Sequence, residues 1–250
     1  NMQTEGDRFD SIKSETLDKL RAIQPFDHRI GPDGRCFKIY NDIAEVATAL
    51  EMHPQARLVA GSTDYSLEVT QGLAEPESLV FVGKVKEMTA CGAESGGIRI
   101  GAATTLRDAA PLLLKHWPSL EELLLRFGSP QIRNQATIGG NVANASPVGD
   151  TPPVLLALDA TLELRKGAST RTLPIKEFFQ SYKKTALDRG EFIVSIFIPV
   201  DDRKPTVRAY KVTKRFEDDI SSVCMVVHWR KVNGRFSDVS IALGGMAEIP

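Results

Sequence analysis

The segment from Phe127 to Asp150 constrains the fold of this chain most, because it contains almost no bulky side chains. It consists largely of small residues, Asn, Ser and Thr, with a pair of glycines near its middle. Such a segment buries little apolar area, and glycine raises the entropy cost of ordering the backbone. Small residues let a backbone approach another group closely, and amide N–H groups beside glycine bind anions. We therefore predict that this segment approaches a nucleotide phosphate.

A second segment of the same kind runs from Leu58 to Tyr65, where a short predicted strand leads into Gly61-Ser62-Thr63-Asp64. Taken alone, it is equally typical of an ordinary strand-to-helix turn. Two such segments in one domain fit a ligand with two phosphates, such as FAD, with Asp150 accepting hydrogen bonds from ribose hydroxyls. The alternative is that the glycine-rich part, 137–141, is a packing corner. The chain has neither a Walker P-loop nor a G-x-G-x-x-G fingerprint, so a dinucleotide would be held by a non-Rossmann arrangement.

The composition excludes several classes of function. Of the 250 residues, 42% are hydrophobic and 25% charged, which is ordinary for a globular protein. The net charge of −1 gives no electrostatic footprint for nucleic acid or an anionic membrane. No apolar run reaches the ~18 residues of a spanning helix. The three cysteines are far apart and share no metal-binding spacing, which favours a reducing, cytoplasmic compartment.

The order of predicted elements indicates an α/β (α+β) fold. Helices and short strands alternate in the first half, and strand hairpins dominate the second half. The Asn233-Gly234 pair predicts a tight hairpin turn, and Asp42 predicts a helix N-cap. The predicted helices cover 10–23, 43–51, 106–115, 120–126 and 175–181, and the predicted strands cover 57–60, 79–82, 98–100, 160–165, 171–174, 192–199, 223–231 and 236–243.

No constellation of catalytic side chains stands out. The four histidines show no metal-ligand spacing, and no G-x-S-x-G motif occurs. We therefore predict no catalytic residue and no metal site, and expect a bound cofactor to carry any chemistry.

Several motifs recur in the order found in the FAD-binding domain of the molybdenum hydroxylases, which the chain resembles over about 37–250. They are Leu58-Val59-Ala60-Gly61-Ser62-Thr63-Asp64, Thr137-Ile138-Gly139-Gly140-Asn141, Asn144-Ala145-Ser146-Pro147 through Asp150, Tyr210-Lys211 followed by Phe216-Glu217-Asp218-Asp219-Ile220, and Ala242-Leu243-Gly244-Gly245-Met246-Ala247. The likeness is greatest to small subunits of bacterial xanthine dehydrogenases. It implies the two-subdomain fold of the molybdopterin dehydrogenase (PCMH) type.

The resemblance also implies residue roles. Both glycine-rich loops should wrap the FAD diphosphate, Phe127 and Ile193 should flank the flavin or adenine, and Lys211 should lie close to the flavin and stabilise its reduced form. Tyr182 and the loop around Asp218 should lie on the NAD side. The implied cofactor-binding residues are Leu58, Val59, Ala60, Gly61, Ser62, Thr63, Asp64, Tyr65, Phe127, Thr137, Ile138, Gly139, Gly140, Asn141, Asp150, Ile193 and Lys211.

The resemblance further implies an oxidoreductase module that binds FAD noncovalently in a cytoplasmic enzyme of purine catabolism. It would pass electrons from 2Fe-2S clusters to NAD within a hetero-oligomer whose other parts bind the clusters and molybdopterin. Residues 1–36 would be a linker from an absent iron–sulfur domain, 37–207 the FAD-binding domain, and 208–250 the start of a truncated C-terminal flavoprotein domain. The family usually has Gly where this chain has Ser62, and no cysteine cluster precedes residue 37.

Three alternatives remain at this stage. The first is a flavoprotein subunit of an aldehyde or carbon monoxide dehydrogenase. The second is a stand-alone FAD reductase of the same fold, for which the sequence offers no proton donor or substrate arginine. The third is an interaction module that has lost its cofactor.

Overall fold

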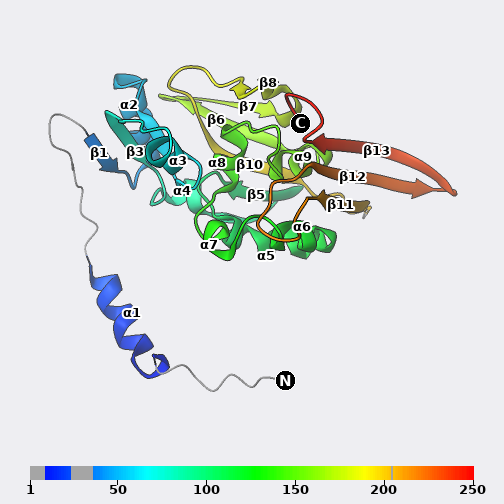
Figure 1. Ribbon diagram of the computed structural model, residues 1–250, viewed down its shortest axis with the longest axis horizontal. Coiled ribbons are helices and arrows are strands. Elements are labelled where there is room, and N and C mark those ends of the chain that lie inside the picture. The colour runs from blue at the N-terminus through cyan, green and yellow to red at the C-terminus, as the bar shows by residue number, and fades with distance from the viewer. Residues whose placement is uncertain (1–8, 24–35, 204) are drawn as a thin grey trace.

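The computed structural model describes residues 9–23, 36–203 and 205–250. Within these ranges the strands form four sheets, in the orders β1-β3-β2, β4-β5-β10-β6-β7, β8-β9 and β11-β12-β13. Figure 1 shows the first of these sheets at one end of the molecule, the five-stranded sheet in the middle and the C-terminal sheet at the other end. The mixture of helices with parallel and antiparallel sheets confirms the predicted α/β (α+β) class.

The first sheet is small and parallel. Asp42 caps the helix that follows β1, as predicted, because the Asp42 side chain accepts from the amides of Ala44 and Glu45. Strand β2 ends at the loop that leads into α3, so this loop lies at the carboxyl edge of a parallel sheet. The elements are β1 (Cys36–Ile39), α2 (Ile43–Met52), β2 (Arg57–Val59), α3 (Tyr65–Thr70), β3 (Ser78–Phe81) and α4 (Lys86–Thr89).

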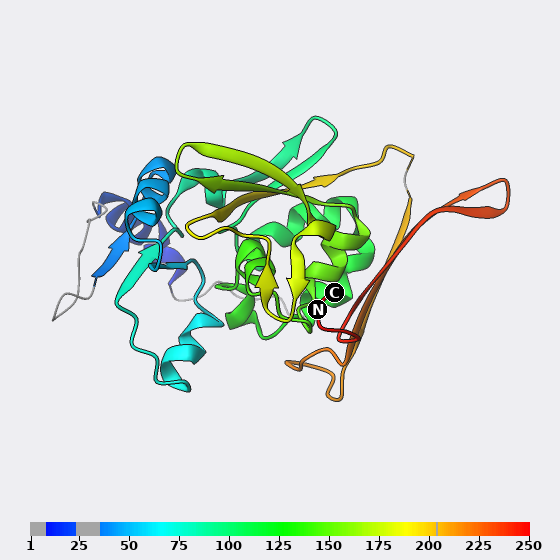
Figure 2. The ribbon, with the colours of Figure 1, turned by 90° about the horizontal axis from the view of Figure 1, so that it is seen from above.

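The central sheet is antiparallel, and the predicted central strand β10 (Phe192–Pro199) lies in its middle. Five helices gather on one face of it, seen as the green segment beneath the sheet in Figure 2. Ile98, Leu162 and Ile196 are fully buried in the core. The elements are β4 (Cys91–Glu94), β5 (Gly97–Gly101), α5 (Leu106–His116), η2 (Pro118–Leu120), α6 (Glu121–Leu125), α7 (Pro130–Arg133), α8 (Ile138–Ala143), α9 (Thr151–Ala157), β6 (Thr161–Lys166) and β7 (Ser169–Pro174).

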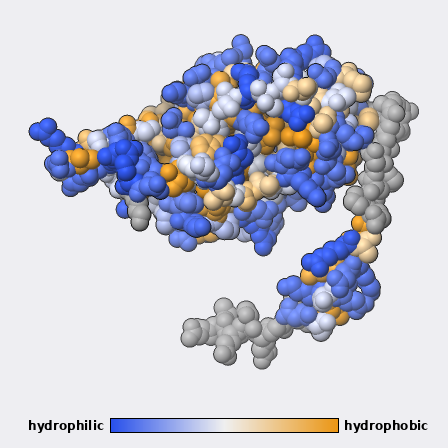
Figure 3. Space-filling view, turned by 180° about the vertical axis from the view of Figure 1, so that it is seen from behind, coloured by the Kyte–Doolittle hydropathy of each residue, from blue (hydrophilic) through white to orange (hydrophobic). Residues whose placement is uncertain are grey.

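The C-terminal sheet consists of β11 (Thr206–Val212), β12 (Val223–Val232) and β13 (Arg235–Gly244). Asn233 and Gly234 have φ of 51° and 78°, which confirms the predicted hairpin turn. One face of this sheet packs on α9 and buries Cys224, Val226 and Ala242. The β12–β13 hairpin projects from the body, and Figure 3 shows its mainly hydrophilic end at the left.

Two local predictions differ from the structure. The segment 175–181 is not one helix: a single turn, η3 (Ile175–Glu177), is followed by β8 (Phe179–Ser181), which pairs with β9 (Lys184–Thr185). The backbone pairing explains the difference: β8 pairs with β9, and the Phe178 carbonyl accepts from the Ala186 amide, so these backbone groups bond to a second segment rather than along a helix. The small-residue segment 127–150 contains two short helices, α7 and α8, rather than an open loop.

The predicted N-terminal helix is present as η1 (Asp10–Ile12) and α1 (Lys13–Ala22), and none of its residues is buried. The proposed linker role of 1–36 concerns 1–8 and 24–35 as well, which lie outside the described residues.

Candidate cofactor site

A cavity of about 720 Å³ lies where the loop after β2 faces α8. This volume is typical of small-molecule and cofactor sites, which range over about 300–1,000 Å³. The cavity brings together most of the predicted cofactor-binding residues, from segments that are far apart in the sequence. Those that line it are Leu58, Val59, Ala60, Gly61, Ser62, Thr63, Asp64, Tyr65, Phe127, Thr137, Gly139, Gly140, Asn141 and Ile193.

The loop after β2 presents unused hydrogen-bond donors to this cavity. Within the described residues, the backbone N–H groups of Ser62, Thr63 and Asp64 have no acceptor. Ser62 has φ of 60°, a left-handed conformation that costs a non-glycine residue energy. A Cβ added to Gly61 would lie 1.7 Å from the backbone oxygen of Gln135. The loop is therefore held tightly against the chain, with three consecutive amides left for an anion.

The second glycine-rich segment works differently from the prediction. Thr137 caps α8, and the amides of Ile138, Gly139, Gly140 and Asn141 all bond to acceptors within the chain. A Cβ on Gly139 would lie 2.4 Å from that of Ala102, so this glycine serves helix packing. The interpretation of this segment as a nest of free amides is therefore wrong. What it offers the cavity is the open surface of Gly140, the Thr137 hydroxyl and the Asn141 side chain.

Two predicted flanking residues, Phe127 and Ile193, line the same cavity. Phe127 follows α6, and its backbone oxygen accepts from the Arg133 guanidinium at 3.1 Å. Ile193 lies near the start of the central strand β10 and is buried. Ile138 is buried behind the lining and does not reach the cavity surface.

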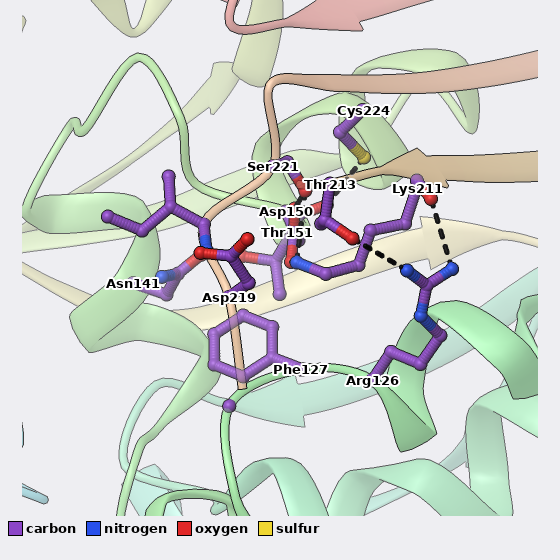
Figure 4. A network of polar contacts seen from close by, with 12 residues as sticks. Arg126, Phe127, Asn141, Asp150, Thr151, Lys211, Thr213, Asp219, Ser221 and Cys224 are labelled. Atoms are coloured by element: carbon purple, nitrogen blue, oxygen red, sulfur yellow. Dashed lines mark hydrogen bonds and ion pairs between the residues drawn. The ribbon is translucent and has the colours of Figure 1, made fainter. Parts of the chain in front are cut away.

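Asp150 and Lys211 do not line the cavity, and they contact each other. The Lys211 ammonium lies 2.6 Å from one carboxylate oxygen of Asp150, and Ser221 donates to the other at 2.5 Å. Figure 4 shows this group beside Phe127 and Asn141. The Thr151 hydroxyl, next to Asp150, donates to the side chain of Asn141. No local pattern indicated Ser221, because its partner Asp150 lies 71 residues away along the chain.

The loop 213–220 contains Asp218, which has φ of 50° and is exposed. Its neighbour Asp219 accepts from the Arg215 amide and guanidinium, and these bonds lower the pKa of Asp219 to about 2. Arg126, at the C-terminal end of α6, holds this loop in place by donating to the Phe216 backbone oxygen and to the Thr213 hydroxyl. No motif in the sequence indicated this role. Tyr182, 59% exposed, lies in the turn between β8 and β9. Neither Tyr182 nor Asp218 lines the cavity.

The described residues hold no group of three or more His, Cys, Asp or Glu placed to bind a metal ion. Cys224 is buried, and loss of solvation raises the pKa of its thiol to about 12. Among the described helices, none has the length and apolar character needed to cross a membrane.

Comparison with known families matches two parts of the chain. Residues 37–201 match the family described as "FAD binding domain in molybdopterin dehydrogenase". Residues 208–250 match the "CO dehydrogenase flavoprotein C-terminal domain".

Curated relatives span a wide range of lengths. Nicotinate hydroxylase hnxS of Emericella nidulans is 34% identical over 82% of this chain, which covers 17% of that protein. The putative xanthine dehydrogenase FAD-binding subunit XdhB of Escherichia coli is 32% identical over 86% of this chain and 76% of that subunit. Xanthine dehydrogenase of Oryza sativa is 35% identical, and the chain covers 16% of it.

Solved structures of carbon monoxide dehydrogenases share this fold. A chain of the enzyme from Hydrogenophaga pseudoflava superposes with a TM-score of 0.81 at 26% identity, over 88% of this chain and 77% of that chain. A chain of the reconstituted enzyme from Oligotropha carboxidovorans gives a TM-score of 0.81 at 27% identity, over 88% and 78%.

Proposed function

Because this chain belongs to the family of FAD-binding domains of molybdopterin dehydrogenases, we propose that it binds FAD noncovalently in the cavity between the β2–α3 loop and α8. The observation that carries the assignment to this cavity is the run of amides at Ser62, Thr63 and Asp64, which line it and have no acceptor among the described residues. Consecutive free amides suit a diphosphate, since each donates to phosphate oxygen without adding a charged side chain.

The other lining residues complete the fit. Thr137 and Asn141 add polar side chains at the facing helix α8, where Gly140 is exposed. Phe127 and Ile193 supply apolar surface for the flat rings of the cofactor. The roles of these residues in binding are part of the proposal.

We propose that the bound module transfers electrons in a xanthine dehydrogenase-type oxidoreductase. FAD supplies the exchange of one or two electrons, which links one-electron iron–sulfur centres to a two-electron acceptor such as NAD. The protein binds and orients the cofactor and limits water around it. Its proposed partners are an iron–sulfur domain and a molybdopterin-binding subunit, in a cytoplasmic hetero-oligomer of purine catabolism.

The proposed division of the chain is 37–207 for the FAD-binding domain and 208–250 for the start of the C-terminal flavoprotein domain. The matches over 37–201 and 208–250 support it. Tyr182 and Asp218 are proposed to lie on the NAD side; both are exposed and neither lines the cavity, whereas Lys183, next to Tyr182, does.

A second candidate is the flavoprotein component of a carbon monoxide dehydrogenase. The similarity to two such structures at a TM-score of 0.81 favours it. Anaerobic addition of NADH to the FAD-loaded chain separates the two candidates. Bleaching of the flavin absorbance, slowed by Tyr182→Ala, supports the NAD-linked enzyme, whereas an unchanged spectrum favours the second candidate.

Titration of the purified chain with FAD tests the binding site. We expect stoichiometric binding, seen as quenched FAD fluorescence. Gly140→Val should weaken it, because an added Cβ would lie 2.7 Å from the Thr137 hydroxyl oxygen and would force this lining residue to shift. Gly92→Val in β4 is the matched control, because an added Cβ there meets nothing within 4 Å. Absence of FAD binding by the wild-type chain at excess FAD would contradict the proposal.

A further inference from the structure

Three polar side chains form a closed ring where the C-terminal sheet meets the rest of the chain. Lys211 on β11 donates to Asp150 at 2.6 Å and to Ser221 at 3.0 Å, and Ser221 donates to Asp150 at 2.5 Å. Asp150 directly precedes α9, whereas Ser221 lies just before β12. The ring therefore joins segments that are 61 and 71 residues apart in sequence.

The ring is buried and carries no net charge. The side chains of Lys211 and Asp150 are 3% and 6% exposed, and their opposite charges cancel. Cys224, whose thiol donates to the Asp150 backbone oxygen at 3.8 Å, stays neutral because burial raises its pKa. An ion pair taken out of water needs further hydrogen bonds to satisfy its remaining atoms, and Ser221 provides one to each partner.

This ring lies directly behind the wall of the cavity. Thr151 follows Asp150 in the chain, and its hydroxyl donates to the side-chain oxygen of Asn141. Asn141 in turn lines the cavity. Figure 4 shows Asn141, a lining residue, together with Thr151, Asp150 and Lys211. Charges at this depth act strongly on a neighbouring ligand, because little water screens them.

We propose that Ser221 is a positioning residue that holds Lys211 and Asp150 as a charge-balanced pair behind the flavin site. The ratio of reduced to oxidised flavin then depends on this balance and not on Lys211 as a free cation. The physical reason is that the field of a close ion pair falls off faster than that of a single charge. This inference rests on the proposed binding of FAD.

The first test measures the ratio of reduced to oxidised flavin at a fixed solution potential, using the full chain loaded with FAD and a redox dye. Asp150→Asn leaves an unbalanced cation and should raise the ratio by about tenfold. Lys211→Met leaves an unbalanced anion and should lower it by about tenfold. The double variant restores neutrality and should return close to the wild type. Single variants that shift in the same direction, or not at all, overturn the proposal.

A second test changes no charge. It tests the positioning role of Ser221 even if the single charge variants do not fold. Ser221→Ala removes one hydrogen bond from each member of the pair, so the ratio should shift and FAD should dissociate several-fold faster. Ser221→Thr keeps the hydroxyl and should restore both values. Ser222→Ala, an exposed neighbour, is the control and should behave as the wild type.

The outcomes separate this inference from the proposed function. If the wild-type chain binds FAD but Ser221→Ala has the same flavin ratio and FAD dissociation rate as Ser222→Ala, only the positioning role of Ser221 is overturned. Wild-type chain that fails to bind FAD overturns the proposed function.

Discussion

The guanidinium of Arg126 lies 4.6 Å from the ring centroid of Phe216 and donates to the backbone oxygen of the same residue at 2.9 Å. It also donates to the Lys211 backbone oxygen and to the Thr213 hydroxyl. A single side chain at the C-terminal end of α6, 11% exposed, thus holds the loop 213–220 against the central body. The loop's own exposed residues contribute little apolar burial, so its order depends on these polar contacts.

We predict that Arg126→Leu loosens this loop and lowers the free energy of unfolding by about 2–3 kcal/mol, because three acceptors, two of them partly buried, lose a charged donor. Hydrogen exchange of the loop amides and urea denaturation measure the two effects. Glu122→Gln is the control: it removes only the exposed partner of Arg126, and such a surface pair contributes about 0–1 kcal/mol. Equal effects of the two substitutions would show that the contacts of Arg126 with the loop contribute nothing to the free energy of unfolding.

Replacement of Gly61 should be costly even without cofactor. A Cβ at this position would lie 1.7 Å from a backbone oxygen, which no side-chain rotation can relieve. We expect Gly61→Ala to lower the free energy of unfolding by about 2–3 kcal/mol. Gly92→Ala, where the added Cβ meets nothing within 4 Å, should change it by less than about 1 kcal/mol. Thermal denaturation of the FAD-free proteins measures both, and a stable Gly61→Ala variant would contradict the close approach.

The loop should also respond to acid in a defined window. Hydrogen bonds from the Arg215 amide and guanidinium lower the pKa of Asp219 from 3.8 to about 2. A carboxylate with a depressed pKa stabilises the folded form above its unfolded pKa, and this contribution disappears as the pH falls through the folded pKa. Loop protection should therefore be constant from about pH 8 to 5 and decline between about pH 4 and 2.

Asp219→Asn is the reference for that measurement, because it lacks the titrating group. NMR exchange rates of the Arg215 and Ile220 amides, which donate to Asp219, report the effect directly. A wild-type loop that already loosens near pH 6 would contradict the assignment to this carboxylate.

The cysteines should differ in reactivity. Cys91 is exposed, whereas Cys224 is buried and its pKa is raised to about 12 by loss of solvation. Because the thiolate is the reactive form, iodoacetamide at pH 8 should label Cys91 in the native protein and Cys224 only after unfolding. Peptide mass spectrometry distinguishes the sites. Labelling of native Cys224 at the rate of Cys91 would indicate that the ring at Asp150 opens frequently.

Local sequence signals predicted much of the fold. Asp42 caps its helix, Asn233-Gly234 forms its turn, and β10 is the central strand, because each depends on residues near in sequence. The segment 175–181 was predicted wrongly as a helix, since its second half pairs with the later strand β9, a contact that a local pattern does not show. Short helices such as α8 escaped prediction because glycine is a poor helix former and Thr137 capping alone is a weak signal.

The sequence by itself determined that two distant segments of small and polar residues with glycine, 58–65 and 127–150, exist and that the chain resembles FAD-binding domains. The tertiary structure decided what each segment does. Among the described residues, the amides at 62–64 have no acceptor, whereas those at 138–141 bond to acceptors such as the backbone oxygens of Ala102 and Thr104. It also decided that Asp150 and Lys211 neutralise each other with Ser221. The reason is that hydrogen-bond partners and burial depend on contacts between residues far apart in sequence, which local patterns do not encode.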